Sequence, residues 1–231
     1  MQVVGFCWNF PKTTETKMRI PKNVLYEKLE ANTALKQLFV EEVEEIILTN
    51  ILAPRTLNIN PHSEVPELNI ITITLRKKEL DIALIEAIDK AMPRQVIWQL
   101  QRPIEKEETE EMETCYFACY KHKMDNGKWH ISNYFKSYWV LQKNAEIRPL
   151  PIATDSKSLY ETMLKALLPI DANIQPQQNM AEITALLAKR TELEKKIATL
   201  RNKLAKEKQF NRKISLHHQL NELIAELEMN S

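Results

Sequence analysis

Few residues in this chain have the type and spacing that metal binding requires. Cys115 and Cys119 stand four residues apart in an apolar, strand-like segment, with His122 and His130 nearby. This spacing lacks the two-residue knuckle of a structural zinc site. Because free cysteine is among the residue types most often buried, we expect both thiols to pack inside a sheet.

Carboxylates that could hold a catalytic metal are scattered along the chain. A nuclease of the restriction type needs an acid on one strand and an acid-x-lysine pair on the next. The candidates for such positions are Glu64, Glu67 and Glu79, with Lys77 or Lys78. The strand expected between them, Asn69–Arg76, places no acid where that site needs one. The pattern therefore gives a nuclease little support.

Motifs that bind phosphates or nucleotide cofactors are also missing. The chain has 2 glycines, Gly5 and Gly127, and neither has a second glycine at motif spacing, which excludes the Walker and dinucleotide-binding fingerprints. The acidic run Glu105–Glu113 lacks the ligand pattern of a calcium loop and is expected to be a solvated loop. We therefore predict no catalytic site, no cofactor and no metal. A divergent metal-dependent nuclease or hydrolase is kept as the alternative.

The strongest charge feature is a basic run near the C-terminus, in which one acid, Glu207, stands among eight cations, a local excess of seven. The cations are Lys195, Lys196, Arg201, Lys203, Lys206, Lys208, Arg212 and Lys213. Such a run can neutralise several phosphates of a nucleic acid, with binding that weakens in salt. The simpler alternative is a solvated flank of a coiled coil. Phe210 stands out as an apolar anchor in this polar stretch.

The same region has the periodicity of a long helix. From Gln177 onward there is no proline or glycine, and apolar residues three and four apart predict a coiled-coil seam of Leu193, Ile197, Leu200 and Leu204. The pattern restarts at Leu216 in another phase, so the tail is either one stuttering helix or a hairpin that turns near Lys208–Asn211. Adjacent His217 and His218 point about 100° apart on a helix and cannot bind one ion together.

The first two thirds of the chain mix helical and strand patterns. Apolar spacing predicts helices within Lys22–Asn50, with Thr33 capping the second, and over Lys78–Met92. β-Branched residues predict a buried strand at Asn69–Arg76, and alternation predicts another at Gln95–Gln101. A short strand is expected around Leu57 and Ile59.

A β-hairpin should follow these elements. Asp125-Asn126-Gly127 is a strong turn signal between the strands Thr114–His122 and His130–Val140. The fold class is therefore α/β or α+β with a mixed sheet, in three parts. We expect an α/β domain over residues 1–150, a proline-punctuated linker with a short helix over 151–177, and a charged coiled-coil or helical-hairpin tail over 178–231.

Composition limits where the protein works. The net charge is +1, so electrostatic arguments have to be local, and the odd count of 3 cysteines suits a reducing compartment. No apolar run approaches the roughly 20 residues that a membrane span needs, and the N-terminus lacks a signal-peptide pattern. We expect a cytoplasmic protein without membrane contact.

Three segments of the sequence resemble one known family. They are Phe10-Pro11 with Arg19-Ile20-Pro21-Lys22, the helix from Leu84 to Pro93 that contains Ile88-Asp89-Lys90, and the tail run Lys206–Lys213. Together they resemble a bacterial family of domains of unknown function, DUF4391, over nearly the whole chain. The acidic insertion at Glu105–Glu113 departs from the family pattern.

The resemblance implies a genomic context and no particular chemistry. The resemblance implies that the gene lies beside genes for SNF2-type helicases and DNA methyltransferases, in restriction or phage-defence clusters. No catalytic residues are established for the family. We therefore expect a non-catalytic accessory subunit whose partner is the helicase or methyltransferase of its system, with DNA contact through the tail. A self-associating scaffold that oligomerises through its C-terminal helix, without nucleic acid, is the third hypothesis.

Overall fold

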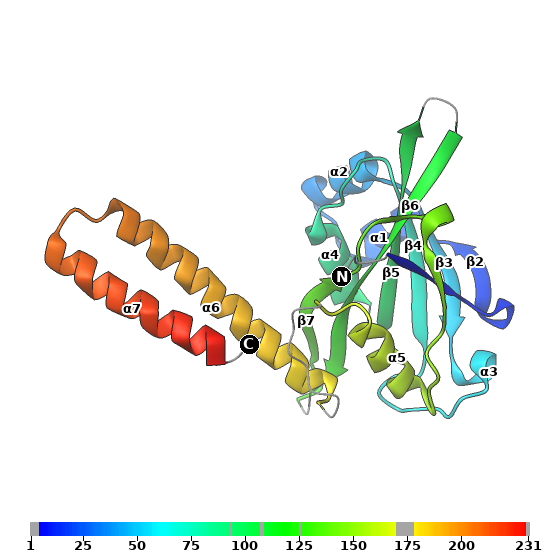
Figure 1. Cartoon of the computed structure of the whole chain (residues 1–231). Helices are drawn as coiled ribbons and strands as arrows, with labels where there is room; N and C mark the ends of the chain where they lie inside the picture. Colours follow the sequence, from blue (N-terminus) through cyan, green and yellow to red (C-terminus); the bar gives the residue numbers. More distant parts are fainter. Residues whose placement is uncertain (1–4, 93, 107–108, 125, 170–177, 230–231) are drawn as a thin grey trace. The chain divides into compact units, whose positions relative to one another are not determined.

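The computed structural model describes residues 5–92, 94–106, 109–124, 126–169 and 178–229, with the side chains of all but 105, 106, 109, 110 and 229. The chain divides into two compact units, Met1–Leu168 and Pro169–Ser231. The first is a mixed sheet with flanking helices and the second is a pair of helices (Figure 1). The expected mixed α/β class is therefore confirmed. No helix in the described ranges is long and apolar enough to span a bilayer.

The first unit is built on a seven-stranded sheet. Its strands lie in the order β2 (Glu15–Arg19), β3 (Val43–Leu52), β4 (Leu68–Leu75), β5 (Gln95–Lys106), β6 (Thr109–Lys123) and β7 (Trp129–Lys136), with β8 (Val140–Leu141) also paired to β6. All neighbours are antiparallel except β4 and β5, which are parallel and joined through helix α4 (Ile82–Ala91). A separate parallel pair joins β1 (Phe6–Asn9) to β9 (Glu146–Pro149).

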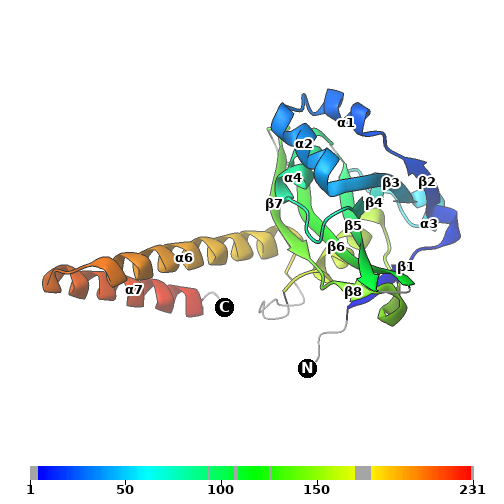
Figure 2. The ribbon, with the colours of Figure 1, turned by 90° about the horizontal axis from the view of Figure 1, so that it is seen from above.

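Helices cover both faces of this sheet. Cys119 and Tyr120 are successive residues of β6, and their side chains contact Asp89 of α4 and Tyr160 of α5 (Ser156–Lys165) respectively. Because successive side chains of a strand point to opposite faces, α4 and α5 lie on opposite sides of the sheet. Helices α1 (Lys22–Lys28) and α2 (Thr33–Glu42) share the core of the α4 side (Figure 2).

The Ile-Pro-Lys segment has a structural role at the edge of this core. Pro21 precedes α1, where its missing N–H costs nothing, and the Nζ atom of Lys22 donates to the carbonyl oxygens of Phe39 (2.9 Å) and Val43. These carbonyls end α2 and start β3, and a lysine there satisfies acceptors that the helix leaves free. Lys22 therefore fixes the junction between helix and strand.

The sequence-based prediction of helix up to Asn50 is wrong beyond Glu42, because residues 43–52 form strand β3. Its buried positions are Val43, Ile46, Asn50 and Leu52. Two bulges interrupt the pairing with β4, one between Val43 and Glu45 and one between Leu48 and Asn50. Each bulge adds a residue to the period of two, so the first three buried residues fall three and four apart as in a helix.

The acidic run was predicted as a solvated loop, and the structure instead extends β5 to Lys106 and starts β6 at Thr109. Residues 107 and 108 lie outside the described ranges. The acids further along are paired with cations, Glu113 with Arg102 at 2.7 Å and Glu111 with Lys143. Because both faces of this two-stranded ribbon are polar, its sequence lacks the hydrophobic alternation that indicates a strand.

Smaller corrections concern element ends and loops. The predicted strand at Leu57 and Ile59 is absent, because Pro54–Leu57 forms the short helix α3. The cap of α2 is Asn32 and not Thr33, since its side chain accepts from the N–H of Leu35 at 2.9 Å. Two 3-10 helices complete the unit, Lys12–Thr14 and Gln142–Asn144.

The two long helices of the second unit settle the choice left open for the tail. Helix α6 (Met180–Lys206) and helix α7 (Phe210–Met229) pack side by side as a hairpin, joined by three residues (Figure 1). A coiled coil is not confirmed. The short helix expected in the linker is α5, which belongs to the first unit.

Candidate nucleic-acid interface

The predicted seam is used inside the hairpin. Leu193 and Ile197 of α6 are buried, as is Leu220 of α7, while Leu200 and Leu204 are half-buried. An ion pair between Lys189 and Glu226 (3.1 Å) also links the helices. The apolar stripe of α6 thus packs against α7 of the same chain.

A short connection fixes the end of the hairpin. The carboxylate of Glu207 accepts from the backbone N–H groups of Lys208 and Gln209, each at 2.8 Å. These hydrogen bonds, chiefly that from Gln209, lower the pKa of Glu207 below its ordinary value. The only acid of the basic run is therefore engaged in holding the turn.

The turn places the two parts of the basic run on adjacent arms of the hairpin, in the half nearest the turn. Five of its cations precede the turn on α6, Lys208 lies in it, and two follow on α7. All eight are exposed. Across the described part of the chain, Lys196 alone among them has an ion pair, with Glu192 at 2.6 Å. We call this surface, residues 195–213, the cationic tip.

Two apolar side chains are exposed within the cationic tip and just beyond it. Phe210, the first residue of α7, is 75% exposed, and Ile214 is 47% exposed. Four residues apart, they lie one turn apart on the same face of the helix. The apolar anchor expected at Phe210 is thus presented to solvent beside cations.

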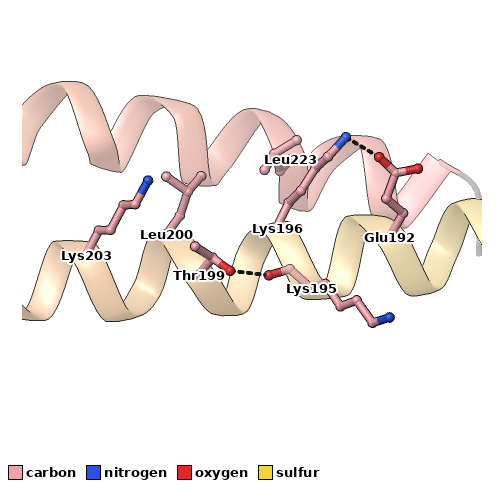
Figure 3. Close-up of a pocket in the computed structure, with 7 residues that line it drawn as sticks. All are labelled: Glu192, Lys195, Lys196, Thr199, Leu200, Lys203 and Leu223. Carbon is pink, nitrogen blue, oxygen red and sulfur yellow. Dashed lines mark hydrogen bonds and ion pairs between the residues drawn. The ribbon is translucent and has the colours of Figure 1, made fainter.

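A shallow hollow lies between the helices, a little before the turn. Leu200 of α6 and Leu223 of α7 contribute apolar surface to it, and Lys196 and Lys203 lie on the same side of α6 as Leu200 (Figure 3). Lysine stems cover apolar surface well while their charged ends remain in water. The hollow is therefore lined by three members of the cationic tip, Lys195, Lys196 and Lys203, together with Glu192.

The most polar cluster of the first unit is buried and fully paired. The Nζ atom of Lys121 donates to Oδ1 of Asp89 at 2.7 Å and to the carbonyl oxygens of Asp89, Met92 and Arg94. The other oxygen of Asp89 accepts from Tyr134 Oη (2.7 Å) and Trp98 Nε1 (3.2 Å).

This cluster joins α4 to three strands and leaves no free group for a substrate. Both charged side chains are almost completely buried, at 2% and 0% exposure. Sequence reasoning missed the pair, although Lys121 at the end of a largely apolar run and an aspartate on the apolar face of a helix were a usable signal. Asp89 belongs to a segment that carries the family resemblance, and its role here is structural.

The acids considered for a nuclease do not meet. Glu64 is paired with Lys157 (2.8 Å) and Glu67 with Arg94 (3.5 Å), both before β4, whereas Glu79 follows β4 and is exposed. Eight strand residues separate the two ends by about 25 Å. Within the described residues, no three His, Cys, Asp or Glu side chains are grouped to hold a metal ion. The nuclease alternative thus has no common site among these residues.

The cysteines and histidines lie in packed or exposed positions. Cys115 and Cys119 are buried on the α4 side of β6, and burial raises the pKa of the Cys115 thiol to about 12. His122 stacks on Tyr120 (5.1 Å between ring centroids) and lies 4.9 Å from His130. His217 and His218 are exposed on α7.

Comparison with known families places the whole fold in one of them. The family model described as "Domain of unknown function (DUF4391)" matches residues 8–227, which include the sheet and the helical hairpin. No curated protein and no solved structure gives a significant match. The chain belongs to the DUF4391 family.

Proposed function

We propose that this protein is a non-catalytic accessory subunit of a helicase-associated DNA-processing or phage-defence complex, and that the cationic tip contacts nucleic acid. The observation that carries the proposal is the presence of eight exposed cations on both arms of a hairpin, in the half nearest the turn. Seven of them have no ion pair in the described residues and are available to phosphates.

The physical basis is the high charge density of nucleic acids. A duplex carries a negative charge about every 1.7 Å, and each phosphate neutralised by lysine or arginine releases counterions. The eight cations lie on two adjacent helices and the turn between them, so several of them can face one stretch of backbone. Outside residues 195–213 the chain has 24 lysines and arginines against 30 acids, a net charge of −6, so contact with a polyanion should concentrate at the tip.

The α/β unit is proposed to bind the protein partner, the helicase or methyltransferase of the same system. The support is the family resemblance together with the structural roles of Lys22 and Asp89, two polar residues of the resembling segments. Self-association through Leu193 and Ile197 is less favoured, because α7 already covers them.

The test is a binding titration with variants of the full chain. Replacing Lys203, Lys206 and Arg212 by glutamine should weaken binding to a DNA oligonucleotide about tenfold or more at low salt. The matched control replaces Lys28, Lys36 and Lys128, which are exposed lysines of the first unit, by glutamine. Equal losses in the two triple variants, or none in either, would contradict a role for the tip.

A further inference from the structure

The exposed ring at the tip is unexplained by phosphate binding alone. Phe210 is 75% exposed and has no hydrogen-bonding group in its side chain, so it can neither hold a phosphate nor read the edge of a base pair. Single exposed apolar side chains are common on protein surfaces, and Phe210 differs from them in lying among the cations of the tip and one turn from exposed Ile214. What it contacts has to offer an apolar face next to negative charge.

Three kinds of partner combine these features, and the charge pattern separates them. An anionic membrane requires a broad apolar helix face, but the exposed apolar stripe here consists of Phe210 and Ile214, since Leu220 is buried and Leu216 half-buried in the hairpin. The centre of a protein–protein interface is depleted of charged residues, and lysine is depleted throughout such interfaces. A nucleic acid offers closely spaced phosphates beside the flat faces of its bases.

The aromatic ring indicates whether the bound nucleic acid is single-stranded or double-stranded. In a duplex the faces of the bases are stacked on one another, whereas single strands expose them. We propose that the cationic tip prefers single-stranded nucleic acid, with the ring of Phe210 stacked on an unpaired base and the flanking lysines and arginines on its phosphates. This inference rests on the proposed function and names the substrate class of the same surface.

The neighbours of Phe210 fit this arrangement. Lys206 precedes the turn, Lys208 lies within it, and Lys213 lies one turn beyond Phe210 on α7, so cations surround the ring along the chain. Ile214 continues the apolar face by one turn. An unpaired strand laid along α7 would therefore meet Phe210 and Ile214 with its bases and these cations with its backbone.

The experiment measures fluorescence anisotropy of the full chain with a labelled oligothymidylate of about 20 nucleotides and with its duplex, at one low salt concentration. Phe210→Ala should weaken single-strand binding by about 5- to 140-fold, the range of one base–aromatic stack, and change duplex binding less than about twofold. Phe210→Trp should restore or strengthen single-strand binding. Phe210→Leu, which is apolar without an aromatic face, should behave like Phe210→Ala.

The control is Tyr138→Ala, an exposed aromatic of the first unit, which should leave both affinities unchanged. Because Phe210 makes little contact within the fold, circular dichroism of the variants should match that of the parent chain. Equal single-strand affinity for Phe210→Ala and the parent would overturn the inference while leaving tip-dependent DNA binding intact. If the parent chain binds neither oligonucleotide, the proposed function and this inference are both overturned.

A parallel experiment with lipid vesicles distinguishes membrane binding from nucleic-acid binding. Co-sedimentation with vesicles that contain phosphatidylserine should be weak and independent of Phe210. Strong retention that Phe210→Ala abolishes, with unchanged oligothymidylate binding, would assign the ring to a lipid surface and contradict the proposal.

Discussion

The ammonium group of Lys121 lies 2.7 Å from the carboxylate of Asp89, with both side chains almost fully enclosed by the protein. Lys121 comes from β6 and Asp89 from the last turn of α4, so this ion pair joins the crossover helix to the sheet. The lysine also donates to the carbonyl oxygens of Met92, the C-cap of α4, and of Arg94, which lies just before β5. A buried charge left without its partner has no water to compensate for the loss.

Removing one member of this pair should therefore destabilise the first unit strongly. Lys121→Met should lower the free energy of unfolding by about 3–5 kcal/mol. The control is Lys123→Met, two residues further on the same strand, where the lysine is exposed and the expected change is within about 0.5 kcal/mol. Urea unfolding followed by tryptophan fluorescence measures both values. Similar midpoints for the two variants would show that the buried pair is not a major contribution.

Acidification should destabilise the fold through His122. Burial, and then the neighbouring His130, lowers the pKa of His122 below its ordinary value of 6.5. As the pH falls through 6.5, the unfolded chain takes up a proton that the folded chain resists, so stability decreases with falling pH in that window. Nearby Glu64 and Lys157 act in opposite directions on this histidine.

The measurement compares urea midpoints at pH 7.5 and 5.5. His122→Phe keeps a ring against Tyr120 and should reduce the loss of stability between the two pH values. His217→Phe, at an exposed position of α7, should leave the loss as in the parent chain. If His122→Phe and the parent lose the same stability on acidification, His122 does not carry the effect.

The thiols should differ in reactivity. Burial raises the pKa of both Cys115 and Cys119, and that of half-buried Cys7 as well. Since the thiolate is the reactive form, Cys115 and Cys119 should resist alkylation in the folded chain at pH 8, and Cys7 should react first and slowly. Mass spectrometry after iodoacetamide treatment identifies the labelled residues, and all three should be labelled in denaturant. Labelling of Cys119 as fast as Cys7 without denaturant would contradict the packing of β6.

Within the seam, the hairpin should depend more on the buried residues than on the half-buried ones. Ile197→Ala removes a buried side chain and should cost about 2–4 kcal/mol, whereas Leu204→Ala, at a half-buried position, should cost less. Hydrogen exchange of the α7 amides reports on this unit without interference from the sheet. Faster exchange in the Leu204 variant than in the Ile197 variant would contradict the observed packing.

The sequence allowed the strong local patterns to be read correctly. The apolar strand around Ile70–Leu75, the helix after Asp81 and the turn at Gly127 were recognisable because propensity and turn chemistry agreed there. Strand β3 was wrongly predicted as helix because its two bulges give helical spacing, which no local rule distinguishes from a helix. The two strands that contain the acidic run were wrongly predicted as a loop, because their acids are paired with Arg102 and Lys143, and the sequence does not reveal these partners.

The composition of the cationic tip could be predicted from the sequence, but the arrangement of its residues in space could not. The eight cations and Phe210 were evident in the sequence, but their arrangement depended on whether the tail turned near Lys208. Two bonds from the turn to the carboxylate of Glu207 are among the contacts that hold this bend, and the sequence showed Glu207 only as an acid among lysines. The hairpin converts a linear run into a surface on two adjacent helices.

The most direct test of the account is the salt dependence of nucleic-acid binding by the full chain, compared with the variant that lacks the charges of Lys203, Lys206 and Arg212. A plot of log affinity against log salt should be linear and steep, with each phosphate contact adding about 0.7 to 0.9 to the slope. Losing three cations should reduce the slope by about 2 to 3, while the variant at Lys28, Lys36 and Lys128 keeps the parent slope. An unchanged slope in the tip variant, or no binding by the parent chain at low salt, would contradict the central claim.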